Sequence, residues 1–274
     1  MGGGDSAMRQ AIRKYRRYAS LAFQETIAYR VPYAVNMVSI IVTYLVIFLI
    51  WMAVFSGKAE VGGYQWAEMK TYLIISLFMS ALISGSSEFR ISRQIRTGNI
   101  AIELLRPADY QLGSLAITLG NSMSEGALVG VACLGFALAT GPGVLPPNAF
   151  AWAGFALACA IAFAPKLLLV YVFGLACFWT NSLMGVSWLR KGLTDFFSGA
   201  LIPLSFFPLW LKHTADWLPF KSIVWVPASA FTGRLAGLEL ARALGVGAAW
   251  AVALWFIARF IWSRAMRKVT IQGG

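Results

Sequence analysis

The sequence offers few side chains that could carry out bond chemistry. His213 is its one histidine, so no set of histidines can build a catalytic metal centre. The nucleotide-binding pattern Gly-x-x-x-x-Gly-Lys-Ser/Thr is absent, as are the Gly-x-Ser-x-Gly pattern of hydrolases and the His-Glu-x-x-His pattern of zinc proteases. We therefore expect this chain to be no enzyme and to hold no catalytic residue, cofactor or metal.

Two ionisable residues, Glu125 and Lys166, fall within long apolar runs. An unpaired charge inside a membrane is costly, so each side chain needs a partner or water. One interpretation is a polar contact in a translocation or ion route. The other is a structural role, either as a pair that bridges the third and fourth spans or at positions near a membrane interface. We favour the structural role, because two groups do not form the relay that ion-driven transport needs.

The stretch from Arg90 to Tyr110 is a basic, polar interruption between apolar runs. Gly98 permits a sharp turn, Asn99 can cap a helix, and Pro107 stops one. Between them, apolar residues recur at helical spacing. The spacing predicts a short amphipathic helix from Asn99 to Leu105. Such a helix is too short to be stable alone, so it needs a surface to press against. The alternative is a solvated loop that only joins two spans.

The composition places the chain in a membrane. Of its 274 residues 59% are hydrophobic and only 12% are charged, and apolar runs of membrane-spanning length recur. We expect an all-α, polytopic protein with a single transmembrane domain over residues 1–274. The net charge of +12 is attributed to cytoplasmic loops and not to nucleic-acid binding. Cys133, Cys159 and Cys177 lie in apolar runs and are interpreted as packing residues.

Six spans are expected within residues 32–264. The third is rich in glycine and serine, which lets neighbouring helices approach closely. Pro165 predicts a kink in the fourth. The start of the fifth is the least defined boundary. The approximate ranges are 32–55, 71–87, 111–140, 148–177, a fifth from within 179–195 to near 204, and 238–262.

The first thirty residues predict a helix that lies on the membrane surface. Over residues 8–29, one arc is apolar and the opposite arc carries Arg13, Lys14 and Arg17. The alternative is a basic tail that only sets topology. Residues 2–6 also match the myristoylation pattern at Gly2, although a flexible glycine-rich lead is the preferred interpretation.

The pattern changes again over residues 206–234. Pro208, Pro219 and Pro227 interrupt any spanning helix, and Trp210, Trp217 and Trp225 suit a membrane interface. We expect two short helices that dip into the outer leaflet and return, which requires them to pack on protein or line a wet cavity. A loop lying flat on the outer surface is the alternative.

Charge asymmetry orients the spans. With both termini inside, sixteen of the 23 Lys and Arg residues fall at cytoplasmic positions, six at outer positions, and Lys166 within a span. Because cytoplasmic loops carry the excess of Lys and Arg, we expect a multi-pass protein of the cell (inner) membrane with both termini in the cytoplasm.

Two runs of residues resemble the membrane (permease) subunits of type-two ABC exporters. The first is R-x-G-x-I-x-x-x-L-x-x-P, formed by Arg96, Gly98, Ile100, Leu104 and Pro107. The second joins Ser198-Gly199, Ile202-Pro203-Leu204, Phe207-Pro208, Leu218-Pro219-Phe220 and Pro227. The resemblance covers nearly the whole chain and says nothing of the substrate.

The resemblance implies an exporter half that is driven by a separate ABC ATPase, which would bind ATP and Mg²⁺. The helix at the N-terminus would be an interfacial elbow helix, and the loop 89–110 would carry a cytoplasmic coupling helix. A second six-span chain, identical or similar, would complete the route. The first, second and fifth spans would flank that route, and the region 206–234 would cap it.

The implied site residues form two groups. The expected ATPase-docking residues are Arg93, Arg96, Gly98, Asn99, Ile100, Glu103, Leu104, Arg106 and Pro107. The expected outer-gate residues are Pro203, Phe206, Phe207 and Pro208. A self-sufficient ion-coupled carrier or channel is the alternative function. A membrane-embedded assembly subunit without a substrate route is a third class.

Overall fold

Long apolar helices form the framework of the chain in the computed structural model, which describes residues 3–28, 30–82, 86–105, 108–141, 143–180 and 183–272. Over these residues the chain is helical apart from one two-stranded antiparallel hairpin. The elements are α1 (Gly3–Ala28), α2 (Arg30–Phe55), β1 (Glu60–Val61), β2 (Tyr64–Gln65), α3 (Trp66–Ala81), α4 (Ser86–Arg96), α5 (Ile100–Leu104), α6 (Tyr110–Thr140), α7 (Ala149–Leu175), η1 (Ala176–Phe178), α8 (Leu183–Phe197), η2 (Leu204–Phe206), α9 (Leu209–Trp217), η3 (Pro219–Ser222), α10 (Trp225–Phe231) and α11 (Gly237–Gln272).

Four of these helices are long and apolar enough to cross a membrane. They are found in the windows Val38–Phe55, Tyr110–Thr140, Ala149–Phe178 and Gly237–Lys268, which match the expected first, third, fourth and last spans. The expected second and fifth spans correspond to α3 and α8, which have 16 and 15 residues. These two helices are shorter than an ordinary span of about 20 residues. The structure therefore supports four spans by length and leaves α3 and α8 as candidates.

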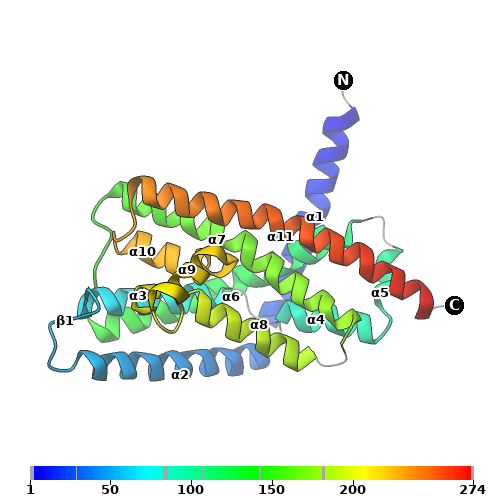
Figure 1. Ribbon diagram of the computed structural model, residues 1–274. Helices are drawn as coiled ribbons and strands as arrows, with labels where there is room; N and C mark the ends of the chain where they lie inside the picture. Colours follow the sequence, from blue (N-terminus) through cyan, green and yellow to red (C-terminus); the bar gives the residue numbers. More distant parts are fainter. Residues whose placement is uncertain are drawn as a thin grey trace.

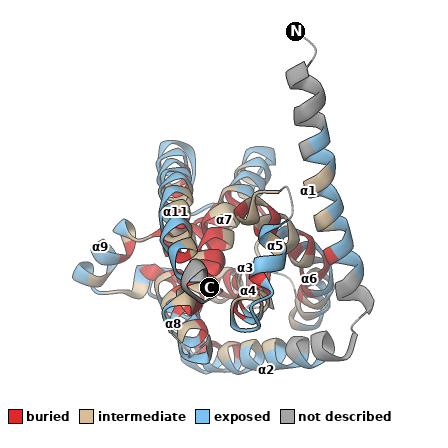
Figure 2. Ribbon diagram, turned by 90° about the vertical axis from the view of Figure 1, so that its right-hand side faces the viewer, coloured by how far each residue is buried: buried red, intermediate tan, exposed pale blue. Residues whose placement is uncertain are grey.

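Helices α2, α6, α7 and α11 run side by side along one axis, whereas α1 leaves this direction at a steep angle (Figure 1). The β1–β2 hairpin lies at one end of the bundle, whereas α5 and the C-terminal part of α11 lie at the other. Figure 2 looks along the bundle from this second end, with α1 at the periphery and α9 projecting on the opposite side. The core lies around α3 and α7, where Tyr72, Met79, Tyr171 and Leu175 are almost completely buried.

Three expected boundaries need correction. Residues 86–96 form helix α4 and not a loop, so the first basic residues of the 89–110 stretch lie on a helix. Helix α3 begins at Trp66 because Gln65 and Glu68 form a capping box there. Helix α11 continues well beyond residue 262, since its sequence has no glycine or proline between Gly247 and Gly273 to stop it.

The small residues of α6 bring α1 close, as the composition of the third span predicts. A Cβ on Gly120 would lie 2.1 Å from the carbonyl oxygen of Ala19, so the backbones of α1 and α6 touch at this point. The hydroxyl of Ser124 donates a hydrogen bond to the carbonyl of Phe23 at 3.3 Å. Helix α1 is thus anchored on the bundle by backbone contact, which only a residue without a side chain permits.

The region 206–234 folds as two short helices, α9 and α10, as expected. Pro208 precedes α9, Pro219 begins η3, and Pro227 lies in the first turn of α10, positions where proline costs a helix little. Helix α10 is buried from Val226 to Ala230, whereas α9 exposes Trp210 and Trp217.

Candidate functional site

The sharp turn that joins α4 to α5 is built on Gly98. Its φ of +72° is in the left-handed region that favours glycine, as the sequence predicts. Asn99 precedes α5 but its side chain makes no capping hydrogen bond, so the expected cap is wrong in that detail. The turn is closed instead by backbone hydrogen bonds, from Thr97 N–H to Arg93 and from Gly98 N–H to Ile95.

Helix α5 turns one apolar residue inward and the others outward. Ile100 is buried, with 3% of its surface exposed, whereas Ile102 is 59% and Leu105 85% exposed. Ile102 and Leu105 were not predicted as site residues, although both lie within the helix expected from Asn99 to Leu105. Helix α5 and the residue that follows it therefore present an exposed apolar patch.

Most of the expected docking residues share this surface. Arg93, Arg96, Gly98 and Asn99 are exposed beside α5, Leu104 is 40% exposed, and Glu103 is half-buried. Arg106 and Pro107 lie outside the described residues. We call the exposed set the docking surface; it comprises Arg93, Arg96, Gly98, Asn99, Ile102, Leu104 and Leu105.

The docking surface is tied to two long helices, α6 and α11, at the start of α6. Asp109 accepts a hydrogen bond from Leu112 N–H at 2.9 Å and forms an ion pair with Arg259 of α11. The Tyr110 hydroxyl donates to Gln94 of α4 at 2.9 Å, and its ring stacks on Trp262 at 4.4 Å. Helix α4 is therefore joined to α6 by a hydrogen bond, and α6 is joined to α11 by an ion pair and a ring contact.

A groove of about 540 Å³ opens along the bundle between α2 and α8. Residues of α3 and α4 and part of the segment after α8 complete its lining. Its wall is mainly apolar, and a smaller set of polar groups gathers at α4, α7 and α8. The apolar and aromatic lining includes Ile40, Tyr44, Ile47, Phe89, Trp188, Leu201, Ile223 and Val224.

Lys166 lies in this groove and its charge is satisfied by backbone. Its ammonium donates to the carbonyls of Met79 and Ser80, at 2.5 and 2.8 Å, at the carboxyl end of α3. The negative end of a helix dipole is a favourable place for a cation. Glu125 is buried on α6. A direct pair between Glu125 and Lys166 stays a prediction.

A buried ion pair joins α4 to α8 in the same groove. Glu88 and Arg190 form this pair, and their side chains are only 1% and 8% exposed. The pair was not predicted from the sequence. The available signal was an acid just after one apolar run and a base within a later one.

The expected outer-gate residues lie towards the hairpin end. The Phe206 ring stacks on Tyr64 at 5.8 Å and packs on Trp51 at 5.1 Å, and Phe207 packs on Phe196 at 5.1 Å. Pro203 is buried, whereas Pro208 is exposed. The structure brings the two phenylalanines into contact with α2, the hairpin and α8.

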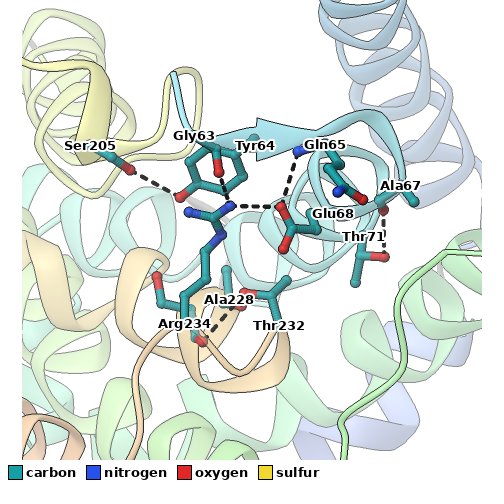
Figure 3. Close-up of polar contacts among 11 residues, drawn as sticks. Gly63, Tyr64, Gln65, Ala67, Glu68, Thr71, Ser205, Ala228, Thr232 and Arg234 are labelled. Carbon is teal, nitrogen blue, oxygen red and sulfur yellow. Dashed lines mark hydrogen bonds and ion pairs between the residues drawn. The ribbon is translucent and has the colours of Figure 1, made fainter. Parts of the chain in front are cut away.

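Arg234 holds this end together (Figure 3). Its guanidinium donates to Glu68 at 2.6 Å and to the carbonyl of Gly63, and it lies 3.7 Å from the centre of the Tyr64 ring. The Tyr64 hydroxyl shares a hydrogen bond with Ser205 at 3.0 Å. Glu68 also accepts a hydrogen bond from Gln65 N–H at 3.0 Å.

Comparison with known proteins places these features in a family context. A family model described as "ABC-2 family transporter protein" matches residues 41–273, which is most of the chain. No curated protein matches the chain.

Proposed function

The chain belongs to the ABC-2 family of transporter membrane proteins, and from this premise we propose that it is the membrane subunit of an ATP-driven exporter. A separate ATPase subunit would bind ATP and Mg²⁺ and dock on the cytoplasmic end of the bundle. The chain itself would form half of the translocation route and carry out no hydrolysis.

The docking surface is the single observation that carries this proposal. Ile102, Leu104 and Leu105 are exposed beside Arg93 and Arg96 on an element too short to be stable in isolation. Their apolar area favours burial against a partner, and the arginines favour a partner with acidic residues. Because α4 and α6 meet through Gln94 and Tyr110, movement of that partner would be transmitted to the spans.

The experiment is charge reversal at the docking surface. We expect Arg93→Glu with Arg96→Glu to abolish co-purification of the ATPase, because two repulsive contacts replace two attractive ones. The amount of chain in the membrane should not change, since both side chains are exposed. Lys58→Glu, an exposed lysine beside the hairpin, is the matched control and should retain the ATPase.

Normal ATPase retention and export by the doubly reversed chain would contradict this docking assignment. The alternative function, a self-sufficient ion-coupled carrier or channel, makes a different prediction. The purified chain, reconstituted alone in vesicles, would then move solute without nucleotide. Transport that requires the ATPase and ATP argues for the exporter.

We further propose that the groove between α2 and α8 is half of the substrate route. It combines apolar walls with buried charges, which suits an amphipathic substrate. A second six-span chain, identical or similar, would close its open side. Phe206 and Phe207, between Pro203 and Pro208, would form the outer gate, because their rings already bridge α2, the hairpin and α8.

The proposed topology has six spans in the cell membrane, with α3 and α8 as the second and fifth. Helix α1 would lie on the inner surface as an elbow helix, and α9 and α10 would form the outer re-entrant region. The arrangement in Figure 1 supports this proposal, because α5 and the C-terminal part of α11 share one end and the hairpin occupies the other.

A further inference from the structure

A second groove, separate from the proposed route, lies between α11 and the segment that contains α9, η3 and α10. Its volume is about 410 Å³. In Figure 2, α9 projects from the bundle on the side of α11. The residues of this groove and those of the α2–α8 groove do not overlap. Its chemistry therefore needs its own explanation.

The groove concentrates hydrogen-bond donors with positive charge. Lys212 and Arg242 line it, both are exposed, and neither forms an ion pair with any residue in the described ranges. Lys221 also lines it, is bound to Asp216, and lies 4.5 Å above the Trp225 ring. Glu239 contributes one further exposed carboxylate, so the lining carries three cations and two anions. The free cations favour an anionic ligand.

A buried donor adds a second, independent indication. The indole Nε1 of Trp225 is buried and has no hydrogen-bond acceptor among the residues that the structure describes. A buried indole N–H normally donates a hydrogen bond, and leaving it without an acceptor costs free energy. An acceptor oxygen in the groove would remove that cost.

The groove is flanked by exposed apolar and tryptophan side chains of the kind that contact membrane lipids. Val246 and Trp250 continue its wall along α11, and exposed Ile257 and Phe260 follow on the same face of this helix. On the other side, α9 exposes Trp210 and Trp217, residues that favour the headgroup level of a membrane. Cations at one end of a long apolar stripe match a lipid headgroup and its acyl chains.

We propose that this groove binds the phosphate-bearing headgroup of an acidic membrane lipid. Lys212 and Arg242 contact the phosphate, Trp225 Nε1 donates to one of its oxygens or to an ester carbonyl, and an acyl chain lies along α11. The site is distinct from the proposed substrate route and does not depend on the ATPase.

Native mass spectrometry of the full chain in detergent tests this proposal. Bound phosphatidylglycerol is compared with bound phosphatidylcholine, without nucleotide. We expect a clear preference for phosphatidylglycerol, and a loss of about tenfold in its retention for Lys212→Gln with Arg242→Gln, since each removes a charge-assisted hydrogen bond. Trp225→Phe keeps the ring and removes the donor, and should weaken retention less. Lys58→Gln is the control for one lost surface charge and should change nothing.

Three results would overturn the proposal. The first is equal retention of the two lipids. The second is unchanged retention in the double variant. The third is displacement of the lipid by millimolar inorganic phosphate, which would assign the site to a free anion. Because the assay measures lipid and not transport, failure here leaves the exporter proposal untouched, and failure of ATPase docking leaves this one untouched.

Discussion

The ion pair between Glu88 and Arg190 joins the helix beside the docking surface to one wall of the groove. Both charges are buried, so each depends on the other for its stability in the folded chain. We expect Glu88→Gln to destabilise the protein by about 3 kcal/mol, because Arg190 would keep its charge without a counter-ion. Thermal unfolding of the purified chain in detergent measures this change.

Asp195→Asn is the matched control for that substitution. It breaks the ion pair with Lys191 at 2.5 Å, but the Lys191 side chain is 69% exposed, so water screens the charge that remains. Replacing both members of the buried pair, as Glu88→Met with Arg190→Met, should recover most of the loss. If Glu88→Gln and Asp195→Asn lower the stability of the chain equally, the buried ion pair contributes no more to stability than the exposed one.

Residue identity and local spacing predicted part of the sites. The turn at Gly98 and the short helix α5 follow from a glycine and from a four-residue apolar repeat, both local signals. The contact between Glu88 and Arg190 spans about a hundred positions in sequence, and no local pattern announces it. Likewise, the carbonyls that accept from Lys166 become available only because α3 ends at that point.

At the scale of elements, the contact between α1 and α6 places a strict requirement on one residue. Gly120 allows the two backbones to touch, and any side chain there would displace α1. We expect Gly120→Val to lower the melting temperature of the purified chain and to loosen α1, seen as faster proteolysis within residues 10–24. Gly135→Val on the same helix is the control, because nothing lies within 4 Å of a Cβ at that position.

Both variants place the same β-branched residue in a helix, so they share its intrinsic propensity cost. Only the difference between them reports the contact with α1. If the two melting temperatures fall equally, the packing of α1 on α6 does not stabilise the chain. Neither substitution alters a side-chain hydrogen bond or a charge, so the comparison reports only the packing of one helix on another.

The order and nature of the elements could be predicted from the sequence better than their ends. Apolar runs and small residues identified α2, α6, α7 and α11, since these are properties of a whole segment. The helix α4 was missed because its basic residues resemble a loop, and it is held by burial of Ile91 and Ser92 against the rest of the fold. Tertiary packing thus stabilises a helix in a segment whose polar sequence predicts a loop.

At the scale of the molecule, the proposed topology requires α3 to cross the membrane. Its 16 residues rise about 24 Å, less than the hydrocarbon thickness of about 30 Å. Helix α3 is also one of the most buried elements, so protein and not lipid surrounds most of it. A short span is tolerable under these conditions, because neighbouring helices cover its ends.

Cysteine accessibility decides this point. Lys58 precedes α3 and Thr97 follows α4, and both are exposed. In intact cells without the ATPase partner, we expect Lys58→Cys to react with a membrane-impermeant maleimide and Thr97→Cys to react only after permeabilisation.

The unchanged chain gives the background reaction in this experiment, since Cys133 and Cys177 are buried and Cys159 is half-buried. Leu145→Cys, in the segment between α6 and α7, replaces a side chain that is 72% exposed and should react like Lys58→Cys if α6 returns to the outer side. Reaction of Thr97→Cys in intact cells would place the docking surface outside the cell, and no cytoplasmic ATPase could then drive this protein through α5.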